Sequence, residues 1–167
     1  MRVKLGIAGA ASNIKKRDIN LVKALADRLY RYKNDLEIYV CYDPESLPMY
    51  IAQELSSKGL NVKCFACNEE EESKARELGL EAINLNRPRI YREIEFIKSI
   101  DKLIVCGGGS GTLMEVTFAY QMNKPVLLLR GIKGSVEPFR GKFLDKRKRF
   151  KIKSIGLDSN IKKALGI

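Results

Sequence analysis

Short apolar runs alternate along the chain with stretches in which apolar residues recur every three to four positions, and short breakers separate the two patterns. The apolar runs predict strands at residues 3–8, 36–41, 62–66, 82–85, 103–106, 126–129 and 150–155. The helical spacing predicts a helix between successive strands as far as the strand at 126–129, and a last helix after the strand at 150–155. This alternation is typical of a parallel sheet covered by helices, so the sequence predicts an α/β fold.

Local signals place several helix ends. Ser46 is a plausible N-cap with Pro48 in the first turn, and Gly59 ends that helix. The acidic run 69–72 suits the first turn of another helix. A helix is expected over 89–99, with Ile90, Ile94 and Ile97 on one face, and Asp158 is expected to cap the last helix.

The most informative segment follows the strand at 103–106. It is Gly107-Gly108-Gly109-Ser110-Gly111-Thr112-Leu113-Met114-Glu115, with the spacing GGGxGTxxE. Glycines let the backbone approach an oxyanion closely, and the start of a helix offers free N–H groups, so the segment predicts a phosphate-binding loop. It matches neither the P-loop nor the GxGxxG spacing. The alternative is structural: Thr112 caps the helix, Glu115 closes a capping box and the glycines only make a turn.

Length and composition limit the remaining choices. The chain has 167 residues, 45% of them hydrophobic, which predicts one globular domain over 1–167. No apolar run approaches the roughly 18 residues of a membrane span, and the N-terminus leads into a strand, so a cytoplasmic protein without a membrane partner is expected. The absence of histidine excludes histidine bases and histidine metal ligands.

The cysteines are interpreted as structural. Cys41, Cys64 and Cys106 lie in or at the ends of predicted strands, where a free thiol behaves as a small hydrophobe. The Cys64-x-x-Cys67 pair leaves redox chemistry or a four-cysteine zinc site open if the strand ends converge. We expect no bound metal and no cofactor.

Positive charge concentrates near the C-terminus. The formal net charge is +11, and residues 131–167 hold eleven Lys and Arg against three acidic residues. The segment 140–153, with its run at 146–149, could contact nucleic acid or could be a solvated loop.

Arg92 and Glu115 do not fit the apolar pattern of their helices. On a helical wheel Arg92 lies opposite the isoleucine face and beside Phe96, while Glu115 lies beside Phe118. Both are therefore expected to point away from the sheet. They are either ordinary solvated charges or part of a site against which a partner subunit packs.

These residues resemble the Lonely Guy family and its lysine-decarboxylase-like relatives, whose hallmark is PGGxGTxxE. Gly107 replaces the proline of that motif, and Arg92 lies at the spacing of the family's functional arginine. The segments 123–126, 129–131 and 141–145 also resemble a small branch that includes molybdenum-cofactor carrier proteins.

The resemblance implies a dimeric, Rossmann-like three-layer sandwich with a mostly parallel sheet and helices on both faces. The implied ligand is a nucleoside 5′-monophosphate or similar phosphate ester, whose N-glycosidic bond is hydrolysed to free base and ribose 5-phosphate. Arg92 and Glu115 would be the catalytic residues. The phosphate would contact residues of two loops, namely Gly9, Ser12, Gly107, Gly108, Gly109, Ser110, Gly111 and Thr112.

Two departures keep other functions open. The family usually follows the arginine with lysine, where this chain has Glu93, and its early glycine-rich loop is replaced by 41–49, which contains no glycine. The hypotheses are thus a phosphoribohydrolase, a non-enzymatic carrier or sensor of a phosphorylated ligand such as molybdenum cofactor or a nucleotide, and a nucleic-acid-binding protein.

Overall fold

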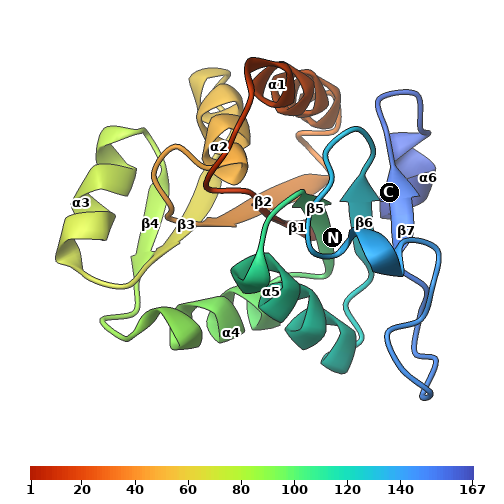
Figure 1. Cartoon of the computed structure of the whole chain (residues 1–167). Helices are drawn as coiled ribbons and strands as arrows, with labels where there is room; N and C mark the ends of the chain where they lie inside the picture. Colours follow the sequence, from red (N-terminus) through yellow and green to blue (C-terminus); the bar gives the residue numbers. More distant parts are fainter.

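Seven strands form one parallel sheet in the order β4-β3-β2-β1-β5-β6-β7 in the computed structural model, which describes residues 1–167 (Figure 1). The strands are β1 (Val3–Gly9), β2 (Leu36–Cys41), β3 (Val62–Ala66), β4 (Glu81–Asn84), β5 (Lys102–Cys106), β6 (Val126–Leu129) and β7 (Lys153–Ile155). The helices are α1 (Lys16–Tyr30), α2 (Leu47–Ser57), α3 (Glu69–Glu77), α4 (Arg89–Ser99), α5 (Ser110–Gln121) and α6 (Ile161–Leu165), with a 3-10 turn η1 (Glu137–Phe139). The fold is α/β and Rossmann-like, as predicted.

The strand order reverses beside β1. The chain adds β2, β3 and β4 on one side of β1 and then returns to add β5, β6 and β7 on the other. Gly9 at the end of β1 pairs with Cys106 at the end of β5. In open parallel sheets, ligands bind outside the carboxyl ends of the strands at such a reversal point. The topology therefore places the expected binding site between the loops that follow β1 and β5.

Each face of the sheet has its own apolar core. Leu5 and Ile7 of β1 join the larger core under α1, α2 and α6, whereas Ala8 joins the core under α4 and α5. Figure 1 shows α1 and α2 on one face of the sheet and α4 and α5 on the other. Alternate residues of one strand supply both layers because successive side chains point to opposite faces.

Most element boundaries agree with the sequence prediction. The structure has β2, β3, β6 and α4 at the predicted residues. Ser46 caps α2, accepting a hydrogen bond from the backbone nitrogen of Met49 at 3.3 Å. The four acidic residues 69–72 form the first turn of α3, where they complement the helix dipole.

Near the C-terminus one prediction is confirmed only in part and another is wrong. The strand expected at 150–155 is reduced to β7, because Ile152 exchanges backbone hydrogen bonds with Gly141 and Lys142. Asn160, and not Asp158, caps α6 by accepting a hydrogen bond from the backbone nitrogen of Lys163 at 2.9 Å, whereas Asp158 pairs with Arg130.

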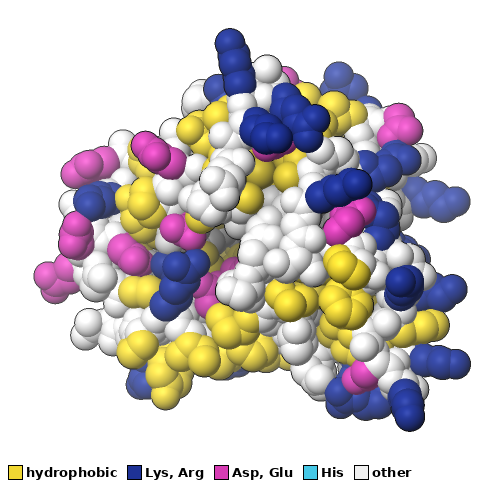
Figure 2. Space-filling view, in the orientation of Figure 1, with side chains coloured by type: hydrophobic (Ala, Val, Ile, Leu, Met, Phe, Trp, Pro, Cys, Tyr) yellow, Lys and Arg dark blue, Asp and Glu magenta, His cyan; other side chains and the backbone are white.

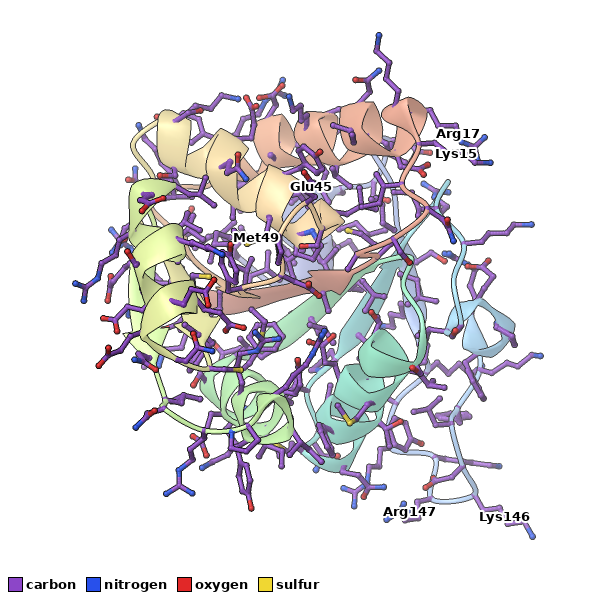
Figure 3. All side chains as sticks on the ribbon, turned by 60° about the vertical axis from the view of Figure 1, so that its left-hand side comes forward. Lys15, Arg17, Glu45, Met49, Lys146 and Arg147 are labelled. Carbon is purple, nitrogen blue, oxygen red and sulfur yellow. The ribbon has the colours of Figure 1, made fainter.

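The basic segment near the C-terminus packs against α5. The ring of Phe150 lies 4.9 Å from that of Tyr120, and the Tyr120 hydroxyl accepts a hydrogen bond from the backbone nitrogen of Arg149. Figure 3 shows Lys146 and Arg147 at the tip of this loop, directed away from the sheet.

No helix in the structure has the length and apolar character needed to cross a membrane.

Candidate functional site

The glycine loop, residues 107–111, connects β5 to α5 at the reversal point. Gly107 has φ +68°, in a region that proline, with φ near −65°, does not reach. The residue that replaces the family's proline thus accompanies a different backbone turn. Gly109 is the N-cap of α5 and supplies no side-chain hydrogen bond, so the first N–H groups of the helix have no side-chain cap.

The capping-box alternative for this loop is wrong. Thr112 does not cap α5, since its hydroxyl donates a hydrogen bond to the carbonyl oxygen of Gly9 at 3.3 Å. That bond joins the start of α5 to the end of β1. Glu115 does not reach back to the helix start and instead lines a pocket beside it. The start of α5 therefore has no side-chain cap and borders this pocket.

A second loop supports the glycine loop from behind. The backbone nitrogen of Ser135 donates to the carbonyl oxygen of Gly108 at 2.9 Å. Gly134 packs so closely that a Cβ there would lie 2.5 Å from that oxygen and 2.6 Å from the carbonyl carbon of Gly107. The sequence motifs did not identify Gly134, although its glycine-rich surroundings directly after the strand β6 were a usable signal.

Two cavities open on either side of the glycine loop. The first, which we call the Glu115 pocket, is a small cavity of about 30 Å³ that opens to solvent. It is defined by Gly9, Cys41, Arg92, Glu93, Thr112 and Glu115. The second, which we call the Lys133 groove, is a more open cleft defined by Ser12, Lys15, Gly108, Gly109, Arg130 and Lys133.

The predicted site residues divide between these cavities. Gly9, Arg92, Gly111, Thr112 and Glu115 line the Glu115 pocket, whereas Ser12, Gly108 and Gly109 line the Lys133 groove. Gly107 is buried behind the loop against Ile132, and Ser110 is exposed as the first residue of α5. The loop itself is therefore the wall shared by both cavities.

The predicted orientation of α4 is wrong. The helical wheel places Arg92 and Phe96 on its outer face, yet they are 2% and 0% exposed and point toward the sheet. Ile90, which the wheel places on the inner face, is 49% exposed. The isoleucine positions indicate the wrong face of α4, because charged residues occupy part of the face that is buried. Arg92 and Glu115 are thus neither solvated charges nor outward-facing residues.

Arg92 is held by groups from two other parts of the chain and by its neighbour on α4, Glu93. It donates to the carbonyl oxygen of Tyr42 at 2.7 Å, to Glu71 of α3 at 3.2 Å and to Glu93 at 3.1 Å. Burial alone lowers the pKa of Arg92, but neighbouring acidic groups, Cys41 and Glu93 among them, raise it above the ordinary value. Its Nε is buried without a hydrogen-bond partner. Arg92 is therefore a fixed positive charge in the wall of the pocket.

Glu93 and Cys41 are pocket residues that the sequence motifs did not identify as site members. The carboxylate oxygens of Glu93 and Glu115 and the sulfur of Cys41 all lie within 4.8 Å of one another. The signals were the position of Cys41 at the end of β2 and the i, i+4 spacing of Arg89 and Glu93, whose side chains pair at 3.2 Å.

Burial shapes the titration of this cluster. Burial raises the pKa of Glu115 well above its ordinary value, and the hydrogen bond to Glu93 and the Glu93 charge raise it further. Burial also raises the pKa of Glu93, but its hydrogen bonds and the Arg92 and Arg89 charges lower it by more, so the net shift is downward. Burial likewise raises the pKa of the Cys41 thiol well above its usual range.

The four cysteines do not gather into one site. All four thiols are free, and only Cys41 belongs to a group of three converging potential ligands. Burial raises the pKa of Cys64 and of Cys106 to about 12, as expected of thiols packed in the apolar core. Arg89 and Arg92 already contact the Glu93 carboxylate, which opposes cation binding at the remaining cluster.

The Lys133 groove presents positive charge to solvent. Five cationic residues line its outer part, namely Lys15, Arg17, Arg130, Lys133 and Arg140, together with Asp18 and Glu137. Figure 3 shows Lys15 and Arg17 at the start of α1, at the opposite end of the view from Lys146 and Arg147. Figure 2 shows acidic side chains over α3 on one side of the molecule and Lys and Arg side chains concentrated on the other.

Solved structures share this fold over nearly the whole chain. TM1055 aligns with a TM-score of 0.80 and 20% identity, covering 100% of both chains. A Moco carrier protein from Chlamydomonas reinhardtii aligns with a TM-score of 0.77 and 15% identity, covering 99% of this chain and 98% of that one. DNA processing protein A from Helicobacter pylori aligns with a TM-score of 0.64 and 14% identity, covering 98% and 79%.

Sequence comparison assigns the family. No curated protein matches the chain significantly. The family described as the SLOG cluster4 family matches residues 58–160, which include β5, the glycine loop, Arg92 and Glu115. Since this match spans more than half of the chain and contains the central elements of the site, the protein belongs to the SLOG cluster4 family.

Proposed function

We propose that this protein binds a nucleoside 5′-monophosphate on the glycine loop and hydrolyses its N-glycosidic bond beside Glu115. The observation that carries the proposal is the position of the Glu115 pocket directly against the uncapped start of α5. The helix start offers N–H groups and a positive dipole to a phosphate. A sugar attached to that phosphate would lie over the mouth of this small pocket, on the side of Glu115.

The residues supply two kinds of assistance. Backbone groups of 108–111 and the Ser110 hydroxyl hold the phosphate, with Gly9 and Ser12 on the facing loop. This positions the sugar so that the reaction is effectively unimolecular. Arg92 holds the pocket charges in place, and Glu115 contacts the reacting sugar. Acid–base assistance from a positioned carboxyl contributes about 10² to 10⁴ in rate.

The test is base release from a panel of nucleoside 5′-monophosphates, followed by chromatography. Wild type is expected to release the base from at least one of them, and Glu115→Gln is expected to lose about 10² or more of that rate. Glu95→Gln is the matched control, because Glu95 lies on α4 with its side chain 43% exposed and paired to Lys98. Equal release by wild type and Glu115→Gln, or none by wild type, contradicts the proposal.

A carrier of a phosphorylated ligand is the second candidate. It is supported by Glu93, which stands where Lonely Guy enzymes carry lysine, and by the structural likeness to a protein named as a Moco carrier. This function predicts saturable binding of a phosphorylated ligand without base release, measured by calorimetry. Glycine-loop variants would lose that binding, whereas Glu115→Gln would retain it.

Nucleic-acid binding through 140–153 is less well supported. The structural neighbour DNA processing protein A is described as binding single-stranded DNA. In this chain Arg140 pairs with Glu137, and Arg147 pairs with Asp145, which offsets part of the charge in the segment. Single-stranded DNA binding that weakens steeply with salt and with replacement of 146–149 would favour this candidate instead.

We also propose that the protein forms a homodimer through the outer face of α4. Ile90 is 49% and Tyr91 48% exposed there. Figure 2 shows hydrophobic side chains gathered along the edge that α4 and α5 form. Light scattering should give a dimer for wild type and a monomer for Ile90→Glu, whereas a monomeric wild type would refute the proposal.

A further inference from the structure

Two buried carboxyl groups face each other inside the Glu115 pocket. Glu93 comes from α4 with a side chain 3% exposed, and Glu115 comes from α5 and is 7% exposed. One carboxylate oxygen of each and the Cys41 sulfur lie within 4.8 Å of one another. Two carboxylates this close in a poorly solvated site do not both ionise, because the second negative charge is repelled by the first.

The two carboxyls have unequal partners. Glu93 accepts hydrogen bonds from Arg89 at 3.2 Å and from Arg92 at 3.1 Å, and the Cys41 thiol donates to it at 3.6 Å. Glu115 makes no ion pair in the structure. The ionised member of the pair is therefore Glu93, which has two positive charges beside it.

The two positive charges near Glu115 are already paired with other carboxylates. Arg89 also pairs with Asp43 at 3.0 Å, and Arg92 also pairs with Glu71 at 3.2 Å. The two arginines thus already face three carboxylates, from the loop after β2, from α3 and from α4. The remaining titratable neighbour, Cys41 of β2, is buried and neutral. Ionising Glu115 would add a fourth negative charge without a partner.

We propose that Glu93 and Glu115 form a carboxylic acid–carboxylate pair in which Glu115 holds the shared proton and is the general acid of the pocket. Glu93 is a positioning residue, since its carboxylate faces Glu115 and would accept the hydrogen bond that orients the Glu115 acid. The assignment of the acid role rests on the proposed function, whereas the proton-sharing pair does not.

The reaction is the hydrolysis of the bond between C1′ of the ribose and the base nitrogen. As the C1′–N bond breaks, its electron pair stays with the leaving base, and the base nitrogen takes the proton from the Glu115 carboxyl. The oxygen of a water molecule bonds to C1′, and the proton that this water loses returns to Glu115. The products are the free base and ribose 5-phosphate, with the pair restored.

Infrared difference spectroscopy tests the pair without requiring turnover. Wild type at neutral pH is expected to show the C=O stretch of a protonated carboxyl, and Glu115→Gln is expected to lack it. Glu93→Gln is expected to lose it as well, because Glu115 then gains the contacts of Arg89 and Arg92 and ionises. Glu95→Gln should retain the band. A band absent from wild type, or surviving in Glu115→Gln, overturns the proposal.

The pH profile of base release tests the acid role. A general acid must be protonated, so kcat for wild type should fall on the alkaline side. Glu93→Gln should move that fall to lower pH, while KM for the monophosphate stays within a few-fold. An unmoved alkaline limb in a folded Glu93→Gln variant overturns the positioning role. If no base is released but the infrared bands behave as expected, the proton-sharing pair stands and the hydrolase proposal falls.

Discussion

The Glu115 pocket and the Lys133 groove share the glycine loop as a wall but treat charge in opposite ways. In the pocket, Arg92, Glu93 and Glu115 are all buried, and each positive charge faces carboxylates of the same chain. In the groove, Lys15 and Lys133 are exposed and make no ion pair. The arginines of the pocket are thus paired with carboxylates, whereas these two lysines of the groove are exposed without an acidic partner.

This difference suggests that the pocket and the groove have different roles. Fixed charges in a poorly solvated pocket act strongly on a reacting group without having to reorganise. Exposed lysines attract an anion from solution, and salt weakens that attraction. We therefore expect the pocket to determine chemistry and stability, and the groove to contribute to capture of the phosphorylated ligand.

The strongest test of the comparison removes the central charge of the pocket. Arg92→Met should lower the free energy of unfolding by about 3 to 5 kcal/mol, since it removes the buried partner of Glu93 and the hydrogen bond to the carbonyl oxygen of Tyr42. Arg89→Met is the matched control, because the Arg89 side chain is 61% exposed and an exposed ion pair contributes about 1 kcal/mol or less. Urea unfolding measures both. Equal losses would show that the pocket charges do not depend on Arg92.

A second test disturbs the wall that both cavities share. Gly134→Ala places a Cβ against the backbone of Gly107 and Gly108, and relieving such overpacking typically costs about 1 to 3 kcal/mol. Binding of a nucleoside 5′-monophosphate, measured by calorimetry, should weaken at least several-fold. Ser135→Ala keeps the backbone bond to Gly108 and should bind like wild type. If Gly134→Ala binds the ligand as tightly as wild type, binding does not depend on the packing of Gly134 against the glycine loop.

A third test uses the pH dependence of stability. The folded-state pKa of Glu115 is raised, so its contribution to stability is fully present below its ordinary value of 4.5 and is lost as the pH rises through the folded value. Glu115→Gln removes this loss. Its stability relative to wild type should therefore increase with pH above 4.5 in thermal unfolding. A difference that is flat with pH would mean that Glu115 is ionised in the folded protein.

The smallest effect is expected in the groove. Lys133→Gln should weaken ligand binding by about 1 kcal/mol or less at low salt, and the difference from wild type should shrink as salt is added. Lys163→Gln on α6 is the control for net charge. Titrations at two ionic strengths measure the effect. A Lys133 effect that persists at high salt would indicate a direct, desolvated contact with the ligand.

Local patterns predicted most of the fold but less of the site. The strands 36–41, 62–66 and 126–129 are found at the predicted residues, because each apolar run lies between clear breakers. The face of α4 was assigned wrongly, since Ile90 follows the apolar pattern but is exposed. Apolar periodicity predicts the buried face of a helix from its hydrophobic residues. The prediction fails where the buried positions hold charged residues that pair with one another.

The sequence by itself determined the order of strands and helices, the glycine loop at the start of α5 and the chemistry that remains without histidine. These properties depend on residues that are neighbours along the chain. Only the tertiary structure decided that Arg92 is buried, that Glu93 and Glu115 meet, and that Gly134 supports the loop. Each depends on groups brought from distant segments, such as Glu71 of α3 and Cys41 of β2, to the place where the sheet order reverses. A charge has no fixed role until folding determines its solvent exposure and its partners.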